Sequence, residues 1–232
     1  MNTLIIVPTY NESDNLPELV RRLENLGMDL DLLIVDDNSP DGTGRMAEEM
    51  ALTRPWLRVM HRPGKKGLGS AYREAFQMAL KQQYDAIGQM DADLSHDPAY
   101  LPAMLRALES ADLVLGSRYR PGGGVRNWGL PRRALSRGGS LYARLLLGVP
   151  VRDLTGGFKL FRRQVLESIE LDTIRSNGYS FQIETTYRTL RRGYRVVEVP
   201  IVFEDRRGGR SKLSRAVVLE AMVMVPRLRL GL

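Results

Sequence analysis

Asp91 and Asp93 are the residues whose types and spacing most directly suggest chemistry. They lie one residue apart and closely follow a short apolar run at residues 86–87. Side chains at positions i and i+2 of an extended segment share one face, so both carboxylates can converge on one divalent cation or diphosphate. The alternative is an acidic turn that caps the next helix, because Asp and Ser are favoured at helix starts. The elements that position the pair distinguish these interpretations.

The first half of the chain alternates between apolar runs typical of buried strands and segments with helical spacing. The predicted strands span residues 3–7, 32–35, 57–60, 86–87 and 113–115, and the predicted helices span residues 15–26, 45–52, 70–83 and 98–109. Strands that alternate with helices predict right-handed βαβ units and an open, mostly parallel α/β sheet. In such a sheet, ligands bind beyond the carboxyl ends of the strands.

Polar residues gather just after the predicted strands. They occupy residues 10–12, 36–37 and 91–95, together with Arg118. Because the carboxyl ends of parallel strands meet at one edge of the sheet, we expect these four loops to share one crevice. This context favours a ligand site over an isolated helix cap for the two carboxylates.

The strand–helix alternation breaks after Arg118. The sequence then predicts a glycine-rich turn at residues 121–124, a helix at 131–147, a strand at 155–161, a helix at 180–191, an extended segment at 195–203 and a mobile loop at 205–211. Residues 214–225 have apolar residues near helical spacing, which is typical of a core helix or of a helix at a membrane interface. We therefore divide the chain into a main domain, residues 1–213, and a C-terminal amphipathic helix, residues 214–232.

The charge of the chain is positive and unevenly distributed. The net charge is +7, and seven arginines lie between residues 118 and 144 without an intervening acid. Such a segment is either a solvated basic face or the partner of an anion such as nucleic acid, lipid headgroups or a phosphate-bearing substrate. No cysteine is present, which excludes disulfides and thiolate metal sites. No apolar run reaches the roughly 18 residues of a spanning helix.

Other phosphate-binding and catalytic motifs fit the spacing poorly. The glycine loop at residues 64–69 lacks the Walker pattern, and the dinucleotide fingerprint would need its third glycine where Tyr72 stands. His61 and His96 are more typical of structural histidines, and no Ser-His-Asp constellation is indicated. A basic nucleic-acid-binding module remains the non-enzymatic alternative, although no standard motif supports it. The chemistry favoured by the residues is metal-assisted transfer between anions.

Four successive motifs, and several later ones, resemble those of a known enzyme family. The first four are residues 7–12 (VPTYNE), 35–43 (VDDNSPDGT), 90–96 (MDADLSH) and 116–119 (GSRY), and the later ones are residues 132–138, 153–158, 178–182 and 211–213. In order and spacing they are similar to inverting glycosyltransferases of family 2 with the GT-A (Rossmann-like) fold. More narrowly, they resemble the dolichol-phosphate or polyprenol-phosphate mannose synthases, over nearly the whole chain.

The resemblance implies roles for individual residues. It assigns donor binding to Pro8, Tyr10, Glu12, Val35, Asp37, Asp91, Ala92, Asp93, Ser95, Arg118, Arg206 and Lys212, with Asp91, Asp93, Arg118, Arg206 and Lys212 closest to the reaction. Asp93 is the first choice for direct metal ligation, with Asp91 beside it, and some relatives carry a glutamine ligand where Ser95 stands. Arg132 and Ser136 would hold the lipid phosphate. Arg207 competes with Arg206 for its role.

The resemblance also implies an activity, a cofactor and a location. The expected reaction transfers mannose from GDP-mannose to dolichyl or polyprenyl phosphate with inversion, assisted by Mg²⁺ or Mn²⁺. A UDP-glucose-dependent polyprenyl-phosphate glucosyltransferase is the alternative within the same motif set. The enzyme would act at the cytoplasmic face of a membrane, bound to its surface or held there by a membrane-anchoring partner subunit, and nucleic acid is not an expected partner.

Overall fold

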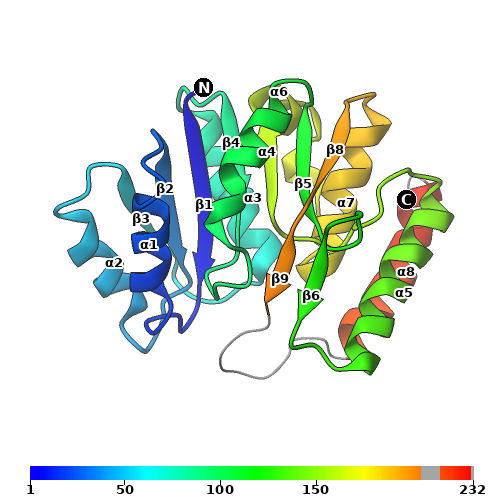
Figure 1. The fold of residues 1–232 in the computed structure, drawn as a ribbon, viewed down its shortest axis with the longest axis horizontal. Helices are drawn as coiled ribbons and strands as arrows, with labels where there is room; N and C mark the ends of the chain where they lie inside the picture. The colour runs from blue at the N-terminus through cyan, green and yellow to red at the C-terminus, as the bar shows by residue number, and fades with distance from the viewer. Residues whose placement is uncertain (205–214, 231–232) are drawn as a thin grey trace.

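A computed structural model describes residues 1–204 and 215–230, except the side chains of residues 215–219 and 221. Its centre is a seven-stranded sheet in the order β3-β2-β1-β4-β7-β5-β8 (Figure 1). The strands are β1 (Thr3–Thr9), β2 (Asp31–Asp36), β3 (Leu57–His61), β4 (Ala86–Gln89), β5 (Leu113–Ser117), β7 (Lys159–Arg162) and β8 (Val196–Pro200). Only β7 runs antiparallel to its neighbours in this sheet. The predicted open, mostly parallel α/β sheet is confirmed.

The register of the central strands sets the position of the polar loops. In β1, Thr9 pairs with Asp36 of β2, and Ile6 pairs with Gln89 of β4, both in parallel register. The N–H of Asp37 continues the ladder by donating to the Thr9 carbonyl at 3.0 Å. The loops that follow β1, β2 and β4 therefore leave the sheet at the same edge.

Helices cover both faces of the sheet. One face carries α1 (Leu16–Glu24), α2 (Thr43–Ala51) and α4 (Leu101–Leu108), and the other carries α3 (Leu68–Leu80), α6 (Arg163–Ser168) and α7 (Gly178–Arg191). Two short 3₁₀ helices, Pro98–Tyr100 and Leu171–Thr173, complete the layers. Continuous apolar strands such as β1 are buried because both faces are covered.

A two-stranded sheet and two long helices lie beside the main sheet. Strands β6 (Gly124–Arg126) and β9 (Val202–Glu204) pair in parallel beyond β8. The long helix α5 (Leu130–Leu147) and the C-terminal helix α8 (Arg215–Leu230) pack against each other at one end of the molecule, and α8 also packs against α7 (Figure 1). Val225 of α8 is fully buried in the same apolar cluster as α3 and α7.

The C-terminal helix predicted at residues 214–232 is present as α8. Its apolar residues near helical spacing end at residue 225, and the helix continues through Pro226 to Leu230. Proline removes the hydrogen bond to the carbonyl four residues earlier, which belongs to Met222. Tyr142 of α5 supplies a replacement, because its hydroxyl donates to the Met222 carbonyl at 3.2 Å. None of the helices in the described part of the chain is long and apolar enough to span a membrane.

Candidate functional site

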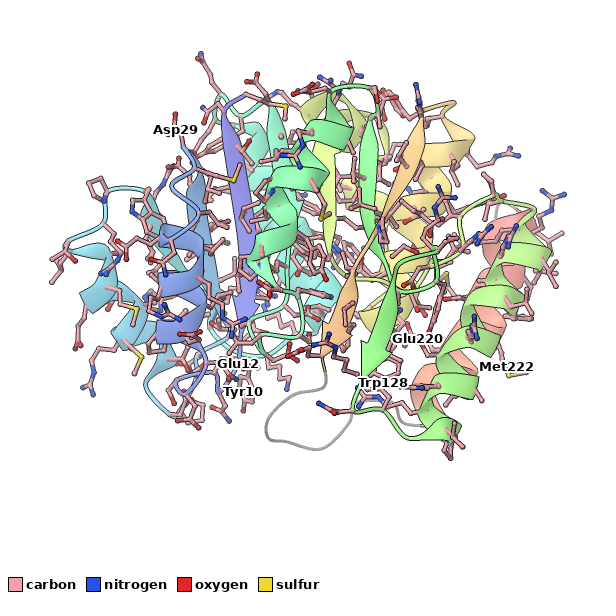
Figure 2. All side chains as sticks on the ribbon, in the orientation of Figure 1. Tyr10, Glu12, Asp29, Trp128, Glu220 and Met222 are labelled. Atoms are coloured by element: carbon pink, nitrogen blue, oxygen red, sulfur yellow. The ribbon has the colours of Figure 1, made fainter. Side chains whose placement is uncertain are left out.

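A cavity of about 370 Å³ opens at the carboxyl edge of the sheet. Of the predicted site residues, Pro8, Tyr10, Glu12, Asp37, Asp91, Ala92, Asp93, Arg118 and Arg132 line it. Val35, Ser95 and Ser136 do not line it. Arg206, Arg207 and Lys212 lie outside the described residues, as does the predicted mobile loop. Figure 2 shows Tyr10 and Glu12 at the end of the sheet opposite Asp29, with Trp128 and Glu220 beside α5 and α8.

Asp36, the last residue of β2, and Asp37, which follows it, make different contacts. Asp36 connects the end of β1 to the loop after β2, because its carboxylate accepts hydrogen bonds from the hydroxyls of Thr9 (2.9 Å) and Ser39 (2.6 Å). Asp37 faces the cavity and pairs with the buried Arg62, which also binds Glu74 at 2.9 Å. Burial raises the pKa of Asp37 above its usual value, although the charge of Arg62 opposes this shift. Asp37 is therefore a carboxylate held rigidly at the cavity wall.

The acid pair after β4 is held by its own loop. Ser95 donates its backbone N–H (3.2 Å) and its hydroxyl (2.5 Å) to Asp93 Oδ1. The N–H of Asp91 donates to His96 Nδ1 at 3.0 Å, so this nitrogen is the acceptor in the contact. The His96 ring is stacked on Phe158 with centroids 5.2 Å apart. His96 therefore positions the loop, as the sequence predicted for a structural histidine, and it also lines the cavity.

The donor set of this loop fits a hard divalent cation that is only partly enclosed by protein. Asp91 and Asp93 both line the cavity, and no group of three or more His, Cys, Asp or Glu in the described residues could hold a metal. Mg²⁺ commonly takes one or two protein carboxylates, with water and phosphate oxygens completing its octahedron. The Ser95 hydroxyl already donates to Asp93, so it supports that carboxylate.

Arg118 is buried in the cavity wall beside the carboxylate of Asp153. Its Nε and Nη2 donate to both oxygens of Asp153 at 2.7 Å, and Nη2 also donates to Thr155 at 2.8 Å. Burial by itself lowers the pKa of Arg118, but the neighbouring Asp153 carboxylate outweighs this and raises it. Burial likewise raises the pKa of Asp153, and the charge of Arg118 outweighs it, leaving that pKa below its usual value.

Arg132 and Ser136 of α5, the predicted acceptor residues, each contact an aromatic side chain from the segment before α5. The guanidinium of Arg132 lies 4.2 Å from the centroid of Trp128. Ser136 is one turn further along α5 and accepts a hydrogen bond from Tyr119 at 2.7 Å, which places its hydroxyl behind the wall. Arg132 is thus the member of the predicted acceptor pair that reaches the cavity, whereas Ser136 is nine-tenths buried behind it.

Several cavity residues had no role in the sequence prediction. Lys65 lies 4.1 Å over the ring of Tyr10, and Asn177, Gln182 and Glu220 also line the cavity. Lys65 belongs to the basic glycine loop at residues 64–69, whose spacing fits neither the Walker pattern nor the dinucleotide fingerprint and indicated no other contact. Gln182 belongs to a motif that carries the family resemblance, but no position in that motif indicated a contact.

Solved structures with a similar fold are glycosyltransferases. A glucosyl-3-phosphoglycerate synthase from Mycobacterium tuberculosis, solved with Mn²⁺, UDP and glucosyl-3-phosphoglycerate, matches the whole chain and 80% of its own, with a TM-score of 0.70 and 20% identity. A mannosyltransferase from Pyrobaculum calidifontis, in complex with GDP-Man and Mn²⁺, matches 90% of this chain and 58% of its own, with a TM-score of 0.59 and 20% identity. These similarities show that the chain has the GT-A fold, with its acid pair beyond the central strands.

Sequence comparisons place the chain more narrowly. The family model "Glycosyl transferase family 2" matches residues 4–170. An undecaprenyl-phosphate mannosyltransferase from Micrococcus luteus is 48% identical over 98% of this chain and 93% of its own. A polyprenol monophosphomannose synthase from Mycolicibacterium smegmatis is also 48% identical, over 96% of this chain and 85% of its own. The chain belongs to glycosyltransferase family 2, and the prediction of an enzyme of this kind is confirmed.

Proposed function

We propose that the protein transfers mannose from GDP-mannose to a polyprenyl phosphate, with inversion at the anomeric carbon. The observation that carries this proposal is the near-full-length identity of 48% to two polyprenyl-phosphate mannosyltransferases. The cavity supports it, because Asp37, Asp91 and Asp93 line it together with Arg132, whose guanidinium lies against Trp128. This arrangement suits a metal-bound diphosphate facing a lipid phosphate.

The nucleotide would occupy the half of the cavity next to β1 and β2. Tyr10 offers an aromatic face and Asp37 an acceptor for the ring N–H donors of guanine, while Pro8 and Glu12 complete the wall. Val35 pairs with Pro8 in the sheet and is fully buried, so it would act through the position of Pro8. The Arg62 partner keeps Asp37 in place before the nucleotide arrives.

Asp91 and Asp93 would hold Mg²⁺ or Mn²⁺, with Asp93 as the primary ligand and Ser95 as its support. The cation would neutralise charge on the departing diphosphate. Ala92, between the two acids, lines the cavity and leaves room for the ribose and diphosphate. The family resemblance adds Arg206 and Lys212 to the same diphosphate site.

The reaction requires no side chain to remove a proton. The acceptor phosphate is already an anion near neutral pH, so one of its oxygens can form the bond to the anomeric carbon directly. The bond from that carbon to the GDP oxygen breaks, and its electron pair leaves with GDP. Alignment and charge stabilisation are therefore the main tasks of the protein, with Arg132 orienting the acceptor phosphate. Attack from the face opposite GDP converts an α-linked donor into a β-linked mannosyl phosphate.

The outer surface of α5 and α8 is suited to a membrane. Its exposed apolar residues are Leu130, Leu135, Leu141, Leu145, Leu146, Met222, Val223 and Leu230. Exposed arginines, including Arg133, Arg137, Arg227 and Arg229, lie on the same two helices, and Figure 2 shows Met222 pointing away from the sheet. We call this the α5–α8 surface. Apolar side chains flanked by arginines bind anionic headgroups at an interface. The surface would bring the cavity to the lipid at the cytoplasmic face, with or without an anchoring partner subunit.

The central experiment offers labelled nucleotide sugars with polyprenyl phosphate and Mg²⁺, and measures lipid-extractable label. GDP-mannose should give labelled lipid, whereas polyprenol without phosphate should not. Labelling from UDP-glucose but not from GDP-mannose would replace the mannosyl donor by the glucosyl alternative. Transfer to the unphosphorylated alcohol at a comparable rate would overturn the mechanism, because that acceptor needs a base.

Membrane binding is tested separately by flotation with vesicles that contain anionic lipid. Leu145 is 72% exposed on α5, so Leu145→Glu should reduce the bound fraction. Leu52 is 86% exposed at the end of α2, outside the α5–α8 surface, so Leu52→Glu is the matched control and should bind as the unchanged protein does. Equal loss in both variants would contradict the assignment of this surface.

A further inference from the structure

Gln182 presents an amide N–H group to the cavity, and none of the described residues accepts a hydrogen bond from it. The residue lies in the second turn of α7, is 2% exposed and lines the cavity. Its Nε2 is buried and has no hydrogen-bond partner in the part of the chain that the structure describes. A buried donor left unsatisfied costs about 1–3 kcal/mol. The cavity is therefore where its partner is expected.

The neighbouring residues fix which way this amide points. Gln89, fully buried in β4, donates from Nε2 to the Gly157 carbonyl at 3.0 Å. A carbonyl only accepts, so this contact sets the orientation of the Gln89 amide. The same Nε2 also donates to Gln182 Oε1. The oxygen of Gln182 therefore faces Gln89, and its N–H group faces the cavity.

The backbone of Gln182 is also anchored. Its carbonyl accepts hydrogen bonds from Lys159 Nζ at 2.7 Å and from the Thr186 hydroxyl at 3.0 Å. Lys159 is fully buried in β7, and burial lowers its pKa well below the usual value. The side chain and the backbone of Gln182 are thus both held before any ligand binds, which is the preorganisation that a substrate-binding group needs.

The surroundings of the Gln182 amide favour an anion as its ligand. A Cβ added to Gly157 would lie 3.3 Å from His96 Cε1, 3.6 Å from Gln182 Nε2 and 3.7 Å from Asp91 Oδ1, so these groups surround the small space beside Gly157, which itself lines the cavity. Gly178 and Tyr179, at the start of α7, line the same cavity, and the first turn contains no acidic residue. Helix N-termini attract anions. Glu220 of α8 already places a carboxylate oxygen 3.4 Å from the N–H of Asn177 there.

We propose that Gln182 Nε2 donates a hydrogen bond to a phosphate oxygen of the lipid acceptor and so helps to orient the nucleophile. This inference rests on the proposed function. The nucleophile is an anion without a proton to give, so a neutral N–H donor is suited to this position, whereas a carboxylate would repel it. Gln182 moves no proton, and Gln89 and Lys159 act through it as positioning residues.

The test compares Gln182→Met with Gln182→Glu in steady-state kinetics, with each substrate varied separately. Methionine has a similar length but no donor, so the KM for polyprenyl phosphate should rise about tenfold or more, as for the loss of one hydrogen bond to a charged group. Glutamate should raise this KM further, because it adds repulsion. GDP affinity, measured by calorimetry, should change less than about twofold in both variants. The control is Gln164→Met, because the Gln164 amide donates to Asp112 (2.8 Å) at the far end of β5.

The two variants separate a phosphate contact from a sugar contact. A sugar hydroxyl can donate to a carboxylate, so activity in Gln182→Glu equal to or above that of Gln182→Met would overturn the proposal. Retained GDP binding shows that a variant is folded. If Gln182→Met fails to fold, Gln182→Asn shortens the same amide, and an unchanged acceptor KM would then contradict the proposal. Failure of the proposed function is distinguishable, because the unchanged protein would transfer no mannose.

Discussion

Asp153→Asn removes the counter-charge of a buried arginine. Asp153 is fully buried and accepts hydrogen bonds from the backbone N–H (2.9 Å), Nε (2.7 Å) and Nη2 (2.7 Å) of Arg118. Asparagine keeps the shape but offers one acceptor oxygen in place of two, and it leaves the charge of Arg118 uncompensated. Breaking a buried ion pair from one side costs about 3–5 kcal/mol. We therefore expect the free energy of unfolding to fall by about that amount.

The assay is urea unfolding at about pH 7, followed by circular dichroism. In a thermal melt the same loss should lower Tm by about 6–20 °C for a chain of this size. The matched control is Glu167→Gln, which breaks the partly exposed pair with Arg163 (2.6 Å) on helix α6 and should cost less than about 1 kcal/mol. The double variant Arg118→Met/Asp153→Leu should recover much of the loss, because apolar residues often replace buried pairs without penalty.

Acid provides a second check on the same interaction. The pKa of Asp153 is lowered in the folded protein by Arg118, whereas in the unfolded chain it is about 3.9. Such a carboxyl contributes its full stability above about pH 4 and loses it as the pH falls through the folded-state pKa. The difference between the original protein and Asp153→Asn should therefore narrow in acid. A loss below about 1 kcal/mol at pH 7, or a difference that does not narrow, would refute the reasoning.

Three further predictions concern the substrates. Asp93→Ala should abolish metal-dependent donor binding while circular dichroism stays unchanged, and full turnover by this variant in EDTA would remove the cation from the mechanism. Asp37→Asn should weaken GDP binding in calorimetry; in the original protein, GDP affinity should fall as the pH drops through the raised pKa of Asp37, and the variant should lack this dependence. Arg132→Ala should raise the KM for polyprenyl phosphate with little effect on GDP affinity, whereas Arg45→Ala, at an exposed arginine of α2, should alter neither.

The sequence was sufficient to predict which loops meet, because strand–helix alternation and the polar residues after each strand are local patterns. It did not indicate that β7 inserts antiparallel between β4 and β5, since strand order depends on the packing of distant segments. Val35 shows a similar limit. The residue is part of a polar-ended motif, but it lies in the buried register of β2 beside Pro8, so its side chain belongs to the core.

Long-range side-chain contacts account for most of what the sequence could not show about the site. Arg118 and Asp153 are 35 residues apart, and Gln89 and Gln182 are 93 residues apart. Arg118 was therefore expected to face phosphate as a separate charge, and the structure gives it a carboxylate partner. The motif containing Gln182 carries the family resemblance. Which end of the Gln182 amide faces the cavity follows from the contact between Gln89 and the Gly157 carbonyl, and the sequence does not show this contact.

The pairing of Arg118 changes how charge is distributed over the proposed reaction. Because Asp153 already neutralises Arg118, this arginine contributes hydrogen-bond geometry more than net positive charge. In the proposed reaction, Arg132, whose guanidinium lies 4.2 Å from the centroid of Trp128, would meet negative charge on the acceptor phosphate. A cation held by Asp91 and Asp93 would neutralise the leaving diphosphate, together with Arg206 and Lys212. Two anions would then approach each other in one cavity because each would have its own source of positive charge, and the N–H group of Gln182 would donate to the acceptor.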